Sequence, residues 1–126
     1  MGDQGDAKDR AIAAIETAIA AHTAARDKIA EVIALKDLNG QDARREEAER
    51  AALDVKIGNL EDELPEYRAA ASVVQAPTQQ EIANVRSRIQ EIRDLAVADA
   101  AQRAGLALIG NILQAATDLK NRNARA

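Results

Sequence analysis

The chain contains a single histidine, His22, and no cysteine, so few of its residues could act as a nucleophile, a general base or a soft metal ligand. A histidine in such a role needs a partner at a helical spacing. Glu16 lies six residues before His22, outside the three- or four-residue spacing of a Glu-x-x-His ligand pair. We therefore expect His22 to be a partly buried, hydrogen-bonded residue, and Glu16 to be a polar residue that sets helix register.

Three further segments resemble ligand-binding motifs only in part. The segment 37–42, DLNGQD, has its glycine at the fourth position, whereas a calcium-binding EF-hand needs it at the sixth. Gly105 and Gly110 are not followed by the lysine and hydroxyl residue of a phosphate-binding loop. The acidic segment 61–66, EDELPE, has no basic or metal-binding companion within it and is expected to be a solvated face. The sequence therefore predicts no catalytic, cofactor or metal site, and a protein that is not an enzyme.

The composition favours closely packed helices over a ligand pocket. None of the 126 residues is Phe or Trp and only one is Tyr, so the core must consist mainly of Ala, Ile, Leu and Val. Small-molecule pockets are usually walled by bulky apolar and aromatic groups. A net charge of −4 argues against a nucleic-acid partner, because such proteins normally carry a basic surface.

No targeting or membrane-spanning segment is expected. The first ten residues, MGDQGDAKDR, are acidic and lack the basic region of a signal peptide. The uncharged run 104–117 would extend about 21 Å as a helix, short of the roughly 30 Å of a hydrocarbon core. We expect a location in the cytoplasm or within a particle or assembly. The abundance of alanine and the excess of Arg over Lys are common in GC-rich bacterial and phage genes.

Three long helices are expected in one domain, at about 6–38, 43–74 and 79–121. Asn39-Gly40 ends the first helix, because both residues tolerate the left-handed conformation of a helix C-terminus. The predicted fold is all-α, an elongated antiparallel three-helix bundle similar to a coiled coil.

The second helix is expected to be kinked at Pro65 but continuous, because its apolar residues keep their spacing across the proline. Pro77 then ends this helix, and Thr78 with Glu81 predicts a capping box at the start of the third. The apolar residues across Pro65 are Leu53, Ile57, Leu60, Leu64, Tyr67, Ala71 and Val74.

The third predicted helix carries apolar faces on roughly opposite sides of its two halves. Either the helix bends or breaks near 96–105, so that both faces enter one core, or it stays straight and the second face meets something else. Length favours the straight helix, since 79–121 would extend about 64 Å against about 48 Å for 43–74. Its last turns, from about Ile112, would then pass the end of the second helix and remain uncovered.

An uncovered apolar face usually marks an interaction site. We therefore expect a non-enzymatic structural or assembly protein that self-associates as a homo-oligomer through this face. The alternative is a helical adaptor or inhibitor that binds a different helical protein through the same face. A membrane-surface helix is a third alternative, which the acidic chain and the lack of lysines on the polar face of that helix disfavour. The residues expected to form the face, with the first allowing close helix approach, are Gly105, Leu106, Ile109, Ile112, Leu113, Ala116 and Leu119.

Overall fold

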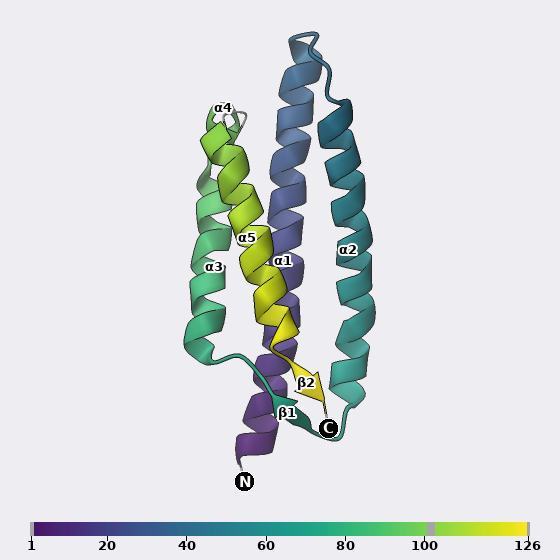
Figure 1. Ribbon diagram of the computed structural model, residues 1–126, viewed down its shortest axis with the longest axis vertical. Coiled ribbons are helices and arrows are strands. Elements are labelled where there is room, and N and C mark those ends of the chain that lie inside the picture. Colours follow the sequence, from purple (N-terminus) through teal and green to yellow (C-terminus); the bar gives the residue numbers. More distant parts are fainter. Residues whose placement is uncertain (1, 101–102, 126) are drawn as a thin grey trace.

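The computed structural model describes residues 2–100 and 103–125. This part of the chain is mostly helical, as the sequence predicts, but it contains four long helices and a two-stranded sheet, so the prediction of a three-helix bundle is wrong. Figure 1 shows an elongated molecule in which α1 pairs with α2, and α3 pairs with α5. The elements are α1 (Gly2–Leu38), α2 (Arg44–Ala69), β1 (Val73–Gln75), α3 (Gln79–Asp94), α4 (Val97–Ala100), α5 (Arg103–Asn121) and β2 (Ala124–Arg125).

The longest helix, α1, is the one on which the others assemble. α2, α3, α4, α5 and β1 all pack against it. Alanine is the most frequent residue at its buried positions, and these small side chains let neighbouring helices approach closely on several sides. Ile15, Ile29 and Ile33 add bulk to the same core. The buried alanines of α1 are Ala11, Ala14, Ala18, Ala21, Ala24 and Ala25.

The connection between α1 and α2 forms where the sequence predicts. Gly40 adopts a left-handed conformation, with φ of 69°, and the Gln41 backbone N–H donates to the Lys36 carbonyl oxygen at 2.7 Å. These two features close the C-terminal end of α1. The Arg44 backbone N–H donates to Asp42 Oδ1 at 3.0 Å, so the aspartate satisfies one free donor at the start of α2.

α2 continues through Pro65, as the apolar spacing predicts, but it ends at Ala69 and not near Val74. Pro65 cannot donate to the carbonyl four residues before it, in Glu61, but only four residues of the helix follow the proline. The structure thus shows α2 as one helix that contains Pro65, and the predicted kink is not part of it. Ala70 leaves the helix in an extended conformation, and Lys8 Nζ donates to its carbonyl oxygen at 2.8 Å.

β1 and β2 form an antiparallel pair that the all-α prediction missed. Val73 lies opposite Arg125, and Gln75 lies opposite Ala124. The predicted helical spacing included Val74, yet Val74 is exposed and Val73 is buried. Successive side chains of a strand point to opposite faces. Strands this short carry too few residues for that alternation to be read from the sequence.

α3 begins with the capping box that the sequence predicts. The Glu81 backbone N–H donates to Thr78 Oγ1 at 3.2 Å, and the Thr78 backbone N–H donates to Glu81 Oε1 at 3.0 Å. Just before this cap, Arg10 Nε donates to the Pro77 carbonyl oxygen at 3.0 Å. The first helix thus holds the chain at the point where α3 starts.

The prediction of one straight helix over 79–121 is wrong. α3 ends at Asp94, and α5 runs back antiparallel to it (Figure 1). Leu95 is extended, and its carbonyl oxygen accepts a hydrogen bond from Lys28 Nζ at 2.6 Å. Apolar faces on opposite sides of one helix can enter a single core only if the chain reverses between them, and their burial favours that reversal. The structure therefore adopts the alternative in which both faces serve one core.

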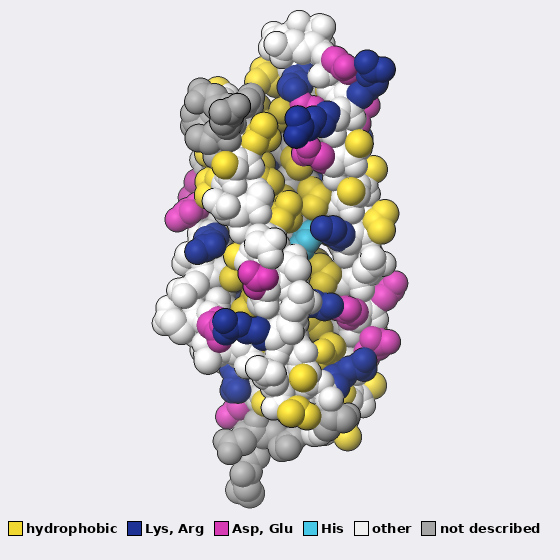
Figure 2. Space-filling model, in the orientation of Figure 1, with side chains coloured by type: hydrophobic (Ala, Val, Ile, Leu, Met, Phe, Trp, Pro, Cys, Tyr) yellow, Lys and Arg dark blue, Asp and Glu magenta, His cyan; other side chains and the backbone are white. Residues whose placement is uncertain are grey.

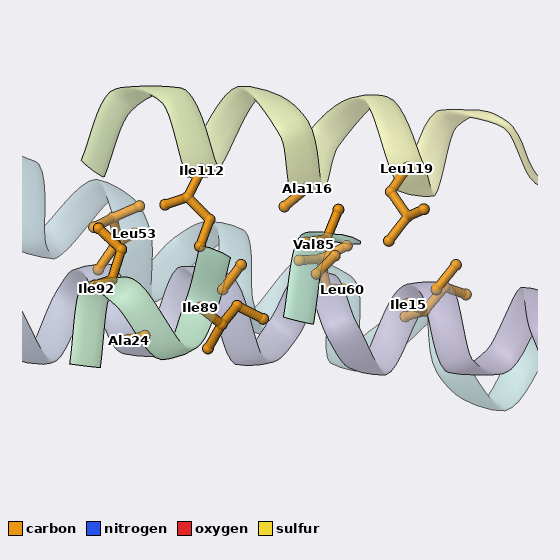
Figure 3. Packing of buried hydrophobic residues seen from close by; sticks show 14 of the residues in the cluster. Ile15, Ala24, Leu53, Leu60, Val85, Ile89, Ile92, Ile112, Ala116 and Leu119 are labelled. Atoms are coloured by element: carbon orange, nitrogen blue, oxygen red, sulfur yellow. The ribbon is translucent and has the colours of Figure 1, made fainter. Parts of the chain in front are cut away.

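The core joins residues from all four long helices in one cluster. Figure 3 shows Ile112, Ala116 and Leu119 pointing from α5 into a layer of side chains from the other helices. Ile112 is fully buried near the middle of this layer. The opposing residues labelled in the figure are Ile15, Ala24, Leu53, Leu60, Val85, Ile89 and Ile92.

Replacing Ile112 with Ala should lower the free energy of unfolding by about 2–5 kcal/mol, because the fully buried side chain leaves a cavity between the helices. Urea unfolding followed by circular dichroism measures the change. Leu38→Ala is the control, since Leu38 is 83% exposed at the end of α1 and its loss should cost less than about 0.5 kcal/mol. Equal losses in the two variants would show that α5 is not part of the core.

Candidate interaction surface

The structure divides the predicted contact face of α5 into a buried part and a surface part. Because the chain reverses after α3, α5 lies along α1, and the buried part enters the shared core; the expectation that it stays uncovered is wrong. Leu106 is 43% exposed and Leu113 is partly buried, so these two remain at the surface. The surroundings of Gly105 lie outside the described residues. The buried part consists of Ile109, Ile112, Ala116 and Leu119.

A groove separates α5 from α2. Both helices pack on α1, and few contacts join them directly among the described residues, so α1 forms the floor of the gap. Apolar side chains are visible along this gap in Figure 2. The wider end of the groove has a volume of about 630 Å³. Its apolar lining and the glycine beside it are Ile29, Leu53, Leu106, Ile109, Gly110 and Leu113.

The charged residues at the rim of the groove are mostly paired with one another. Lys36 Nζ forms an ion pair with Glu46, and this hydrogen bond lowers the pKa of the Glu46 carboxyl below its usual value. Arg45 and Glu49 form a second pair, with Nε and Oε1 3.4 Å apart. Lys56 also lines the groove, and no ion pair joins it to any side chain in the described part of the chain. The rim therefore offers little net charge to a partner.

The other end of the gap is closed by residues from the C-terminal end of the chain. Lys120 Nζ of α5 lies 2.9 Å from Glu63 Oε1 of α2. Arg125 of β2 lies over the Tyr67 ring, 5.1 Å from its centroid, with its Nη2 3.8 Å from Glu66 Oε2. The acidic segment of α2 therefore has basic companions, which the sequence did not reveal because they come from the far end of the chain. A smaller pocket of about 280 Å³ remains between α2 and the second half of α5, with Leu60 and Ala116 among its lining residues.

His22 is buried, and its Nδ1 lies 2.7 Å from the Ala18 carbonyl oxygen, so the predicted role as a buried, hydrogen-bonded residue is confirmed. Burial lowers its pKa from the usual 6.5, the hydrogen bond to Ala18 opposes this shift, and the charge of Lys56 adds to it. Glu16, in contrast, is exposed and lies 3.9 Å from an Arg68 guanidinium nitrogen. Its expected role within the apolar face is therefore wrong.

Among the residues that the structure describes, no group of three or more histidine or carboxylate side chains is placed to hold a metal ion. None of the described helices is long and apolar enough to cross a bilayer. Comparison with family models, with curated proteins and with solved structures found no match for this chain. The argument about function therefore starts from α5 and the groove beside it.

The stability of the protein should fall as the pH drops from about 7 to about 5, because His22 has a lowered pKa in the folded state. In this range the unfolded chain takes up a proton on His22 while the folded protein resists it, so protonation favours unfolding. The Glu46 and Asp42 carboxyls have lowered pKa values and stay ionised in the folded protein. The charged residues that line the same pocket as His22 are Lys56, Glu63 and Lys120.

His22→Gln keeps a donor for the Ala18 carbonyl and removes the titrating ring. Urea midpoints measured across this pH range should therefore fall less steeply in the variant than in the wild type. The same slope in both proteins would assign the effect to groups other than His22.

Proposed function

We propose that this protein is a non-enzymatic structural protein that self-associates through the exposed side of α5 and the groove between α5 and α2. The single observation that carries the proposal is an uncharged surface beside an open apolar groove. The proposed contact lies on the opposite side of α5 from the residues that fill the core. Leu106 and Leu113 belong to both the predicted face and the proposed one.

From Leu106 to Thr117 the exposed side of α5 carries no charged residue. Charged residues make up 30% of the chain, yet the run 104–117 contains none, and it is the longest such run in the sequence. Desolvating charged groups is expensive, and the centres of protein interfaces are depleted in them. Leu106 and Thr117 are also exposed, at the two sides of this surface. We name the four exposed residues between them, which lie within about 100° around the helix, the α5 crest. The crest consists of Ala107, Gly110, Asn111 and Gln114.

Leu106 connects the crest with the groove. It lines the groove, lies one residue before the crest and is one of the few exposed large apolar residues of the chain. The other exposed ones, Leu38, Val55 and Val74, lie on separate elements and form no shared surface with it. Gly110 belongs both to the crest and to the wall of the groove. A helix laid on this side of α5 would therefore cover apolar and uncharged surface together.

The chemistry of the groove supports a binding role and not catalysis. An active site brings a nucleophile, a base or a metal to a pocket with perturbed pKa values. Here the floor is aliphatic, and the carboxylates at the rim, such as Glu46 and Glu49, are paired with basic residues. The composition of the chain fits such an assembly role in a bacterial or phage particle.

Sedimentation equilibrium tests the proposal. The wild-type protein should show a mass that rises with concentration, and Leu106→Glu should shift it toward the monomer, because a carboxylate would be buried at the contact. Losing most of one leucine's burial costs about tenfold in affinity, and a symmetric dimer contains two copies, so Kd should rise about a hundredfold.

Val74→Glu is the matched control, since it places the same charge on an exposed apolar residue of β1, which does not line the groove, and should leave the mass distribution unchanged. Urea unfolding of both variants confirms that each remains folded. A wild-type protein that stays monomeric at its solubility limit would contradict the proposal, and would favour an adaptor that binds a different protein.

A further inference from the structure

Lys56 lies where two cavities between α2 and α5 meet. It lines both the wider end of the groove and the smaller pocket, and it is the one residue that these two linings share. The gap therefore has an apolar part of about 630 Å³ and, next to it, a polar part of about 280 Å³. Sites for small molecules usually measure roughly 300–1,000 Å³, so the gap is large enough to hold one.

The wider end of the groove suits an alkyl chain. Its floor and walls are aliphatic, with Ile29, Leu53 and Ile109 among the lining residues. Leu106 and Leu113, at the two ends of the α5 wall, lie seven residues apart, so this wall extends about 10 Å along the helix. No aromatic side chain lines this part of the gap, so a flat aromatic ligand would find no ring to stack on. Burial of methylene groups is the interaction that such a lining offers.

The smaller pocket contains a buried ring nitrogen without a protein partner. His22 lines this pocket and is only 3% exposed, and Figure 2 shows the histidine, in cyan, within the gap. Its Nδ1 donates to the Ala18 carbonyl oxygen, so Nε2 of the neutral ring is an acceptor, and no described residue is hydrogen-bonded to it. Buried polar atoms usually have a partner. On taking up a proton, Nε2 becomes a donor, and a nearby anion favours that form.

One positive charge beside His22 is not balanced by the protein. The charged residues of the smaller pocket are Lys56, Glu63 and Lys120, and the last two are paired at 2.9 Å. Lys56 forms no ion pair with any side chain in the described part of the chain, and its charge lowers the pKa of His22. Glu63 lies seven residues, or about 10 Å, farther along α2. The place between Lys56 and His22 therefore complements a single negative charge.

We propose that the gap between α2 and α5 binds an alkyl carboxylate, with its carboxylate between Lys56 and His22 and its chain in the wider end of the groove, toward Leu106. An uncharged amphiphile matches only the apolar part of this site, and a small inorganic anion matches only the polar part. Both cavities are formed within one chain, so the site does not depend on the proposed self-association. An alkyl chain there fills the groove beside the α5 crest and leaves the crest exposed.

Calorimetric titrations with decanoate and with decanol, below the concentrations at which they aggregate, separate the two parts of the site. Lys56→Gln should raise the Kd of decanoate about fivefold, because an ion pair is lost, and should leave the Kd of decanol unchanged. Arg50→Gln is the matched control, since it removes a positive charge from an exposed position of α2 that lines neither cavity. The same loss of decanoate affinity in both variants would overturn the proposed place of the carboxylate.

The single histidine reports on the carboxylate in the same wild-type samples. One imidazole signal in the proton NMR spectrum, followed against pH, gives the pKa of His22. Saturating decanoate should raise this pKa, because the negative charge stabilises the protonated ring, whereas decanol should not. A pKa that decanoate leaves unchanged would place the carboxylate elsewhere and contradict the proposal.

Filling the groove tests the place of the alkyl chain. Ala52 and Ala51 are both exposed alanines of α2, but only Ala52 lines the wider end of the groove. Ala52→Trp should raise the Kd of decanoate and of decanol about tenfold, because the indole occupies the place of the chain, and Ala51→Trp should change neither. Urea unfolding checks that both variants remain folded. Equal affinities in the two variants, or a wild type that does not bind decanoate, would overturn the site, while sedimentation tests self-association separately.

Discussion

Close packing on one alanine-rich helix is the constraint on which this structure depends. α1 presents small side chains on several sides, so α2, α3 and α5 can each approach it without competing for the same space. A helix with larger residues at Ala14, Ala18 and Ala21 would push these neighbours outward. The same arrangement places α2 and α5 on different sides of α1, which keeps them apart. The groove between them is therefore a direct result of three helices sharing one narrow support.

Polar side chains of α1 hold the rest of the chain at the points where helices begin or end. Lys8 binds the carbonyl of Ala70 after α2, and Lys28 binds the carbonyl of Leu95 after α3. The last carbonyl groups of a helix have no partner within the helix, and a positive charge also interacts favourably with the dipole there. α1 therefore contributes to stability through its alanines and also sets where its neighbours stop. The chain changes direction after Ala70 and after Leu95, the two residues whose carbonyl groups accept hydrogen bonds from lysines of α1.

Local signals in the sequence were sufficient for the helix boundaries that depend on nearby residues. Gly40 ends α1, and Thr78 with Glu81 caps α3, because each acts on backbone groups within a few positions. The break after α3 depends on a distant residue, Lys28, and on the common core that both apolar faces enter. The two apolar faces on opposite sides of 79–121 indicated this break. The comparison of helix lengths nevertheless favoured a straight helix, which is wrong.

The proposed contact surface on α5 could be predicted only in part for the same reason. The uncharged run was visible in the sequence, and Leu106 and Leu113 do lie at the surface. Which side of that run faces outward depends on where α1 lies. The sequence therefore predicted Ile109 and Ile112 to be exposed, whereas both are buried. The basic partners of the acidic segment, Lys120 and Arg125, come from the last residues of the chain, and their contacts follow no local spacing.

The short pairing of β1 with β2 has a consequence for how α5 stays in place. It joins residue 73 to residue 125 and so closes a loop that contains α3, α4 and α5. The two ends of this segment are held beside α1, one by the hydrogen bond from Arg10 to the Pro77 carbonyl and the other by the hydrogen bond from Asn123 to the Ala11 carbonyl. A segment held at both ends meets its docking site at a high effective concentration, even when each contact is weak. The strand pair thus acts as a tether that makes docking of α5 on α1 an intramolecular event.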